Sequence, residues 1–272
     1  MVNKQSSPGE DGLGYAFLYH LFRYPQLQAI TLQVFNRAML ETKVPSSWHE
    51  IRVRLLPKKG DLSLLKNWRP ISLINCDAKI FTRIMHSRIR QLVSKVINPF
   101  QTGFMPNRFI AENGLLLNVI KEHARVNNRS DIAMLLDQEK AYDRVHPTYL
   151  KLTLLRFGFP DVFVRSLMTL FFGNNIRINV NGHFTSNVTQ QRGLRQGDPL
   201  SPLLFNIALE PFLRHILDDP SFVGFSIPAI VPSADSTATP CPPLAPVKLL
   251  PMPTMSVSFS HPYMTIDFFN VI

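Results

Sequence analysis

A single aspartate follows a short apolar run near the middle of the chain. Residues 132–136 are Ile-Ala-Met-Leu-Leu, and Asp137 comes directly after them. Five apolar residues between polar ones are short for a helix and are typical of a strand covered on both faces. A carboxylate at the end of such a strand is costly to bury alone, so it must be solvated, hydrogen-bonded or bound to a cation. Cation binding is the option that would support catalysis.

Cations upstream could bind an anionic group. Residues 52–61 alternate like a strand that runs into a turn, which places Arg52 and Arg54 on one face. A hairpin that carries Lys58 and Arg69 could present two cations to one triphosphate, because ammonium and guanidinium groups bind phosphoryl oxygens. Exposed Lys and Arg on a surface hairpin are also commonly only solvated, so both interpretations stay open at this point.

Regular elements must position these residues, and the apolar periodicity predicts where they lie. We expect helices at 27–40, 78–97, 110–124, 147–157, 163–172 and from about 202 onward, and a hairpin at 176–184 around Asn181-Gly182. Pro147 at a first helical position and Gly158 after a last one mark the ends of one helix. A mixture of helices and strands, α+β, is therefore the predicted fold class.

Composition favours one kind of partner. The chain has 272 residues, 45% hydrophobic and 18% charged, which is enough to bury a substantial core. A net charge of +10 and a pI near 9.9 favour nucleic acid or an anionic surface, although a basic surface also serves solubility. The polar N-terminus and the lack of a long apolar run predict an intracellular protein that does not span a membrane. Cys76 and Cys241 have no metal-type spacing.

Several ordered segments resemble the reverse transcriptases of LINE-type (non-LTR) retrotransposons. Residues 136–145 resemble the first catalytic motif of that family, and residues 195–206 resemble its second. Residues 67–73 and 101–104 resemble segments of its fingers, in the same order and spacing. Ser7-Pro8-Gly9 with Gly12-Leu13 fits the motif that precedes the fingers. The resemblance runs from about residue 7 to residue 225 and rests on motifs that are far more specific together than singly.

The resemblance implies a catalytic motif. Asp137 would ligate both of two magnesium ions, and the main-chain carbonyl of Gln138 would help to hold one, so that the ions activate the primer 3′-hydroxyl and stabilise the leaving pyrophosphate. Tyr142 would be the steric gate that stacks under the deoxyribose, although it could equally belong to the core. Asp143 is expected to be a structural hydrogen-bond acceptor. Gln138 departs from the aromatic residue that is frequent there in the family.

The same resemblance assigns binding roles. Lys58 and Arg69 would grip the incoming deoxynucleoside triphosphate. Gln196 and Gly197 would line the nucleotide and template pocket, although Gly197 could serve only its turn. Arg108 would contact the template backbone. The expected partners are an RNA template, a DNA primer and deoxynucleoside triphosphates.

The implied architecture is a right-hand polymerase with fingers and a partial palm, and with the thumb absent. We expect a helical entry segment, fingers, a partial palm, a Pro-rich insertion and a tail at residues 1–50, 51–130, 131–227, 228–250 and 251–272. The family also needs a second acidic pair, a Tyr-Ala-Asp-Asp motif on a hairpin, and the sequence does not contain it. Asp218-Asp219 ends a predicted helix and Asp235 lies in the Pro-rich stretch, so neither is expected to replace it.

Back-translation of residues 251–257 offers a reason for the missing motif. When the stretch is read one base earlier, the junction of Met252 and Pro253 must encode Ala, and the neighbouring codons can encode Tyr and two Asp. A TC codon for Ser256 then gives Val, so Tyr-Ala-Asp-Asp-Val is available at the expected place. We therefore expect a one-base frameshift or mispredicted splice near Leu250 and an out-of-frame, disordered tail.

The sequence is thus interpreted as an RNA-directed DNA polymerase (nucleotidyltransferase) domain that is inactive or nearly so, because a carboxylate pair of its two-metal centre is missing. The alternative is a non-catalytic nucleic-acid-binding remnant that retains the basic surface of the fingers. A structural protein with a chance motif would need all the ordered matches to be coincidences.

Overall fold

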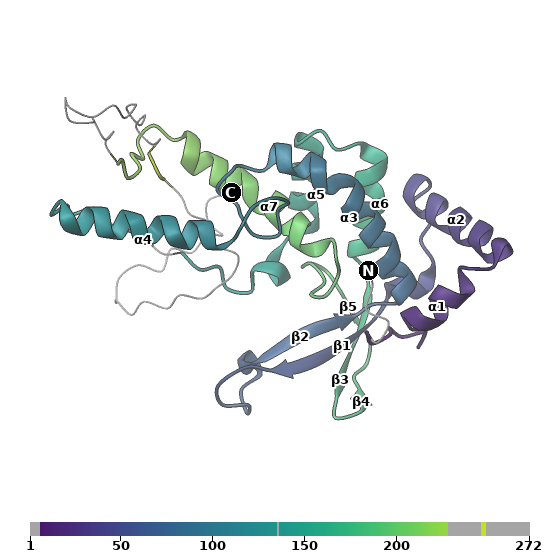
Figure 1. Ribbon diagram of the computed structural model, residues 1–272. Helices are drawn as coiled ribbons and strands as arrows, with labels where there is room; N and C mark the ends of the chain where they lie inside the picture. The colour runs from purple at the N-terminus through teal and green to yellow at the C-terminus, as the bar shows by residue number, and fades with distance from the viewer. Residues whose placement is uncertain (1–5, 135, 228–245, 249–272) are drawn as a thin grey trace.

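A computed structural model describes residues 6–134, 136–227 and 246–248. Within these ranges the chain forms α-helices and a sheet, so the predicted α+β class is confirmed (Figure 1). The helices are α1 (Tyr15–Leu21), α2 (Pro25–Leu40), α3 (Cys76–Val96), α4 (Ala111–Val126), α5 (Pro147–Arg156), α6 (Asp161–Phe171) and α7 (Ser201–Asp218). The strands are β1 (Glu50–Pro57), β2 (Trp68–Leu73), β3 (Asn175–Val180), β4 (His183–Phe184) and β5 (Val188–Thr189), and short 3-10 turns occupy Ser46–His49, Leu65–Asn67 and Ala141–Arg144.

The helices predicted from periodicity form where expected, because their ends carry local signals. In α5, Pro147 occupies the first turn and the His146 side chain accepts a hydrogen bond from the main-chain N–H of Thr148 at 3.2 Å. Gly158 follows the helix with a φ of +82°. The Asn181-Gly182 turn also has positive φ at both positions and joins β3 to β4, which confirms the predicted hairpin.

One hydrophobic core joins α2, α3, α5, α6 and α7. Trp48 is fully buried in it, and its ring lies 5.1 Å from that of Phe81 and 5.9 Å from that of Phe35. The Trp48 indole donates a hydrogen bond to Asp77 Oδ2 at 2.8 Å, so the buried polar atom is satisfied. A smaller cluster of Tyr15, Leu18 and Cys76 fixes α1 against α3. The helices therefore provide a packed body.

The sheet extends from this body and has the strand order β2-β1-β3-β4, with β5 paired to β3 (Figure 1). β1 pairs antiparallel with β2 and parallel with β3, in a register that places Arg52 opposite both Leu73 and Arg177. Because residues two apart along a strand point the same way, Arg52 and Arg54 share one face, as predicted. Ile51 and Val53 point to the other face and are buried.

The predicted strand at residues 132–136 is wrong. The described residues between 131 and 140 form no strand and are exposed, and Ile132 is 94% exposed. A strand needs a partner for its backbone N–H and C=O groups, and no strand in the described part of the chain pairs with this segment.

The expected domain limits at 1–50, 51–130 and 131–227 remain predictions. The expected insertion at 228–250 lies outside the described residues apart from residues 246–248, and the expected tail at 251–272 lies wholly outside them. Among the helices that the structure describes, none combines the length and the apolar character needed to cross a membrane.

Candidate functional site

Three segments that are distant in sequence meet beside the sheet. The main-chain N–H of Leu194 donates to the carbonyl of Tyr142 at 2.8 Å, and the N–H of Gly193 donates to the carbonyl of Val145 at 2.9 Å. The N–H of Ser72, in β2, donates to the carbonyl of Gln196 at 2.9 Å. The turn at 141–145, the loop at 193–197 and β2 therefore form one connected unit, which we call the loop junction.

Gln196 lies at the centre of the loop junction. Its side-chain Nε2 donates to Asp143 Oδ1 at 3.3 Å, so Asp143 acts as a hydrogen-bond acceptor, as the sequence predicted. Gly197 has a φ of +110°, and a Cβ at this position would lie 3.1 Å from the carbonyl oxygen of Ser72. The turn itself therefore requires glycine. The nucleotide role of both residues remains a prediction.

Buried charges hold this turn on both sides. Arg195 and Asp198 are 2% and 3% exposed, and Arg195 Nη2 donates to Asn174 Oδ1 at 2.6 Å and to the carbonyl of Leu170. Asp198 Oδ1 accepts from the N–H of Leu200 at 2.9 Å, at the start of α7. Burial lowers the pKa of Arg195 to about 10 and raises the pKa of Asp198. Both flanks of Gln196 and Gly197 are thus anchored inside the protein, a feature that sequence reasoning missed.

Tyr142 lies at the edge of the core. Its ring stacks on that of Phe205, with the centroids 5.0 Å apart and the planes 12° from parallel. Burial raises the pKa of the Tyr142 hydroxyl to about 12. The packing role that the sequence left open is therefore present, and the role as a steric gate remains a prediction.

Lys58 and Arg69 lie at the far end of the β1–β2 hairpin. Arg69 pairs with Leu56, two residues before Lys58, so the two cations are neighbours at the tip. Both side chains are exposed, and Lys58 Nζ donates to the carbonyl of Lys66 at 3.4 Å. The structure thus brings the predicted pair together, and Arg69 lies on the strand that carries the Ser72 contact to Gln196.

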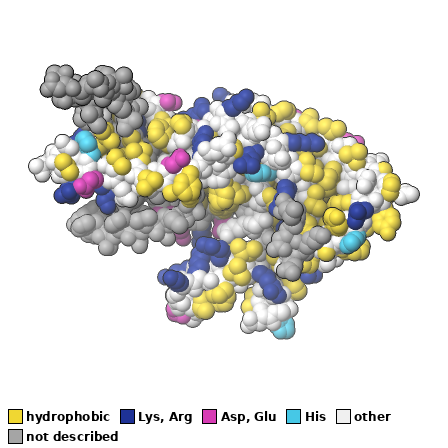
Figure 2. All heavy atoms as spheres, viewed as in Figure 1, with side chains coloured by type: hydrophobic (Ala, Val, Ile, Leu, Met, Phe, Trp, Pro, Cys, Tyr) yellow, Lys and Arg dark blue, Asp and Glu magenta, His cyan; other side chains and the backbone are white. Residues whose placement is uncertain are grey.

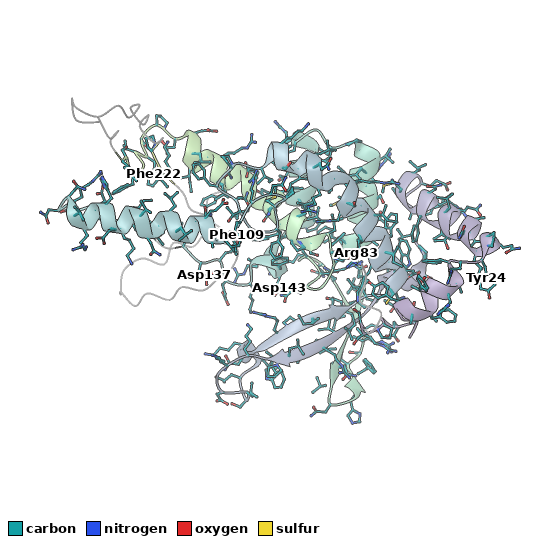
Figure 3. The ribbon with its side chains drawn as sticks, in the orientation of Figure 1. Tyr24, Arg83, Phe109, Asp137, Asp143 and Phe222 are labelled. Carbon is teal, nitrogen blue, oxygen red and sulfur yellow. The ribbon has the colours of Figure 1, made fainter. Side chains whose placement is uncertain are left out.

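Asp137 and Gln138 are exposed, in the irregular segment before the loop junction. Figure 3 labels Asp137 and Asp143 in the same part of the molecule, between the helical body and the β1–β2 hairpin. The acidic Glu139 is paired with Arg144 at 3.0 Å. Asp137 therefore lies in solvent-accessible surroundings rather than in the apolar interior.

The described residues near Asp137 do not form a complete magnesium site. Across the described ranges, no three His, Cys, Asp or Glu side chains are grouped so that they could hold a metal ion. Two magnesium ions need several oxygen ligands from more than one carboxylate, since each ion requires near-octahedral coordination. One aspartate and one carbonyl do not by themselves fit a pair of magnesium ions.

Arg108 has a structural position that the sequence did not predict. Its Nη1 and Nη2 atoms donate to main-chain carbonyls at the end of α3 and in the following loop, those of Ser94, Ile97, Asn98 and Gln101. Burial lowers the pKa of its guanidinium. These bonds satisfy carbonyls that a helix end leaves without partners. The template contact remains a prediction, for a side chain whose terminal donors are already engaged.

A buried carboxylate joins the same loop to α7. Glu210 is fully buried and accepts hydrogen bonds from the N–H and Nδ2 of Asn98 at 2.9 and 2.7 Å and from Gln101 Nε2 at 2.7 Å. Arg214 Nε donates to it at 2.8 Å. The residue was not singled out from the sequence, because a glutamate within a helix is more often solvent-exposed. It fixes the loop that carries the Gln101–Phe104 motif.

Comparisons with known proteins identify the family of this chain. Residues 56–227 match the family described as reverse transcriptase (RNA-dependent DNA polymerase). The chain is 38% identical over 213 residues to a transposon TX1 uncharacterized 149 kDa protein of Xenopus laevis, covering 78% of this chain and 16% of that protein. It is 30% identical over 227 residues to a retrovirus-related Pol polyprotein from a type-1 retrotransposable element R2 of Popillia japonica, covering 81% of this chain and 30% of that protein.

Among solved structures, an apo telomerase from Candida tropicalis truncated from its C-terminal domain superposes with a TM-score of 0.45 and 12% identity, covering 74% of this chain and 47% of that one. The chain spans less than a third of the length of the two retroelement proteins. The family match extends over most of the chain and includes the loop junction and the tip of the β1–β2 hairpin. The chain therefore belongs to the reverse transcriptase family, in its LINE-type (non-LTR) retrotransposon branch.

Proposed function

We propose that this chain is the part of a LINE-type RNA-directed DNA polymerase that binds the template and the incoming nucleotide, and that it does not complete the polymerase reaction by itself. The observation that carries the proposal is the loop junction. It joins Tyr142, Gln196 and Gly197 to β2, and β2 leads to Arg69 and its neighbour Lys58 at the hairpin tip. An exposed Asp137 close in sequence supplies one carboxylate where the family uses divalent ions.

Each residue of the candidate site has its own proposed role in nucleotide binding. Lys58 and Arg69 attract the triphosphate, because both are exposed cations on adjacent strand ends. Gln196 positions the nucleotide from a turn that is held on both flanks. Tyr142 limits the space beside the sugar, since its ring is fixed against Phe205. Magnesium, when bound with a complete acidic set, would supply charge stabilisation for phosphoryl transfer.

Primer extension tests the catalytic part of the proposal. The purified chain is mixed with magnesium, an RNA template annealed to a DNA primer, and deoxynucleoside triphosphates. We expect no template-dependent product above that of an Asp137→Ala variant. Asp131→Ala is the matched control, because Asp131 is a nearby exposed aspartate paired with Arg129. Product that Asp137→Ala abolishes and Asp131→Ala retains would show that the chain is active as it stands.

Nucleotide binding separates the proposal from a remnant that only binds nucleic acid. Trp68 precedes Arg69 in β2, and its indole donates to the carbonyl of Leu62 at 2.9 Å, so its fluorescence reports on the hairpin tip. We expect deoxynucleoside triphosphate to change this fluorescence in the presence of template and primer, and Arg69→Ala to remove the change. Salt-dependent binding of template and primer without any nucleotide response would favour the remnant.

The reading frame near Leu250 is a separate proposal that only nucleotide sequence can test. We propose that a shift of one base there separates the chain from a Tyr-Ala-Asp-Asp-Val motif. Resequencing of the locus and of its transcript should reveal the shifted base or splice. An unambiguous frame that lacks the motif in every register would refute this explanation.

A further inference from the structure

Four arginines lie on one face of the sheet, across three strands. Arg52 and Arg177 are direct partners in the parallel pairing of β1 with β3, and Arg54 lies two residues after Arg52. Arg69 is opposite Leu56, which has the same orientation as Arg54. We call these four residues the arginine face. Figure 2 shows Lys and Arg side chains gathered on the lobe that the hairpins form below the helical body.

Glu10 covers one half of the arginine face. Its carboxylate accepts hydrogen bonds from both Arg52 and Arg177. The guanidinium groups of these two arginines lie 5.2 and 5.3 Å from the centre of the Phe184 ring. The hydrogen bond from Arg52 is the largest cause that lowers the pKa of Glu10. Two guanidinium groups that converge on one acidic group, beside an aromatic ring, also form the arrangement with which proteins bind a phosphate.

The turn that carries Glu10 is docked on the protein. Gly9 is buried, and a Cβ at this position would lie 2.2 Å from Asn75 Oδ1 and 2.4 Å from Asn75 N. The main-chain N–H of Asp11 donates to Asn75 Oδ1 at 3.3 Å. The backbone on both sides of Glu10 is therefore fixed, which keeps the Glu10 side chain within reach of Arg52 and Arg177.

The other half of the arginine face is open. Arg54 and Arg69 are exposed, and no ion pair with either of them is present among residues 6–134, 136–227 and 246–248. Alternate residues of a strand are about 6–7 Å apart, so the guanidinium groups form a stepped row of positive charge. A row of this kind suits a flexible anionic polymer, and the net charge of +10 favours the same partner.

We propose that the arginine face binds successive phosphates of a single-stranded RNA, and that Glu10 occupies the phosphate position between Arg52 and Arg177 until the strand displaces it. The inference rests on the proposed function, since the template would be that strand. It adds a regulated binding surface, which extends from Arg69 at the hairpin tip to Arg52 and Arg177, to the residues that the resemblance assigns. Glu10 would act as a competing anion within the chain.

Equilibrium binding of a labelled single-stranded RNA, followed by fluorescence anisotropy over a series of salt concentrations, tests this inference. Glu10→Gln should bind about two- to fivefold more tightly than the wild type, since the competing charge of a partly buried carboxylate is removed. Asp161→Asn is the matched control, because it removes one carboxylate from an exposed ion pair with Arg165 on α6. The inference fails if Glu10→Gln gains no more affinity than Asp161→Asn.

The arginines supply a second, independent measurement. Arg177→Gln should reduce the slope of log K against log salt by about 0.7, the contribution of one phosphate contact in a single strand. It should also cancel the gain of Glu10→Gln in the double variant. Arg165→Gln, which removes a charge from the control pair, should leave the slope unchanged. Equal slopes for the wild type and Arg177→Gln would overturn the inference.

The outcomes separate the two proposals. Thermal unfolding followed by circular dichroism shows whether Glu10→Gln is folded, and if it is not, the slopes of Arg177→Gln and Arg165→Gln decide. A wild-type chain that binds no single-stranded RNA would refute the proposed function together with the inference. A wild-type chain that binds RNA but shows no effect at Glu10 or Arg177 would refute the inference alone.

Discussion

Replacing Glu210 by Ala should lower the free energy of unfolding of this protein by more than a surface substitution does. Glu210 is fully buried in α7 and accepts hydrogen bonds from three donor groups of Asn98 and Gln101 that are themselves buried. Alanine favours the helix but offers no acceptor, so α7 remains intact while the three donors lose their partner. The perturbation therefore falls on the contact between α7 and the loop at 98–104, and on Arg214, which also donates to Glu210.

The expected size follows from the number of donors. Each buried group left without a partner costs about 1–3 kcal/mol, and removal of one partner from a buried charged network costs about 3–5 kcal/mol. Partial relaxation of the loop offsets some of the sum. We expect the free energy of unfolding to fall by about 3–5 kcal/mol, a large part of the 5–15 kcal/mol that is usual for a domain.

Urea unfolding followed by circular dichroism measures this loss. Glu210→Gln is the graded variant, because its side-chain carbonyl can still accept from part of the donor set, and it should lose less than Glu210→Ala. Glu122→Ala is the control, since Glu122 is exposed and its ion pair is with Arg125 on the same helix. A loss below about 1 kcal/mol for Glu210→Ala, or one equal to that of Glu122→Ala, would show that the network does not stabilise the fold.

Two further predictions concern Gly9 and Tyr142. Gly9→Ala should lower the free energy of unfolding by about 1–3 kcal/mol, because the new Cβ would meet the backbone of Asn75. Gly14→Ala is the control and should not lower it, because no atom lies within 4 Å of the new Cβ. Equal midpoints of urea unfolding for the two variants would contradict this prediction. Tyr142 should ionise near pH 12 in the folded protein, so a late step in the absorbance titration at about 295 nm should vanish in Tyr142→Phe. This folded pKa lies above the unfolded value of about 10, so the stability that Tyr142 contributes is intact below pH 10 and is lost as the pH rises towards 12. If the wild type and Tyr142→Phe lose stability in the same way at alkaline pH, this prediction is refuted.

Elements with local signals could be predicted from the sequence. Pro147 and Gly158 mark the ends of α5 through their own backbone preferences, and Asn181-Gly182 supplies the two positive φ values that the hairpin turn requires. The apolar stripe of α3 is likewise a property of consecutive residues. Each of these predictions needs no knowledge of distant parts of the chain, and each is confirmed.

Elements that depend on distant partners could not be predicted. Residues 132–136 have the composition of a buried strand, but a strand forms only where another strand completes its hydrogen bonds, and composition does not report this. The sequence predicts that Arg108 is free to contact the template, but its terminal nitrogens donate to main-chain carbonyls at the end of α3. A glutamate in a helix is expected to be solvated, and only the structure shows that Asn98 and Gln101 lie beside Glu210.

The candidate site shows the same division. The ordered motifs indicated Tyr142, Gln196 and Arg69, and the structure joins the first two through the loop junction and places the third on a strand that contacts it. The buried Arg195 and Asp198 that anchor this turn could not be recognised, because charged residues in a glycine-rich segment usually face solvent. The carboxylate of Glu10 over Arg52 and Arg177 depends on the parallel strand pairing, which no local pattern reveals.

That parallel pairing also sets the order in which the protein can assemble during synthesis. Glu50 and Asn175 are joined by a side-chain hydrogen bond across 125 positions, so β1 has only β2 beside it until most of the chain has left the ribosome. Until then, the open edge of β1 exposes a row of unpaired backbone groups, which is a template for aggregation. Because closure of so long a loop is slow, nascent chains that end before residue 175 keep this edge unpaired and are expected to aggregate more readily than the full chain.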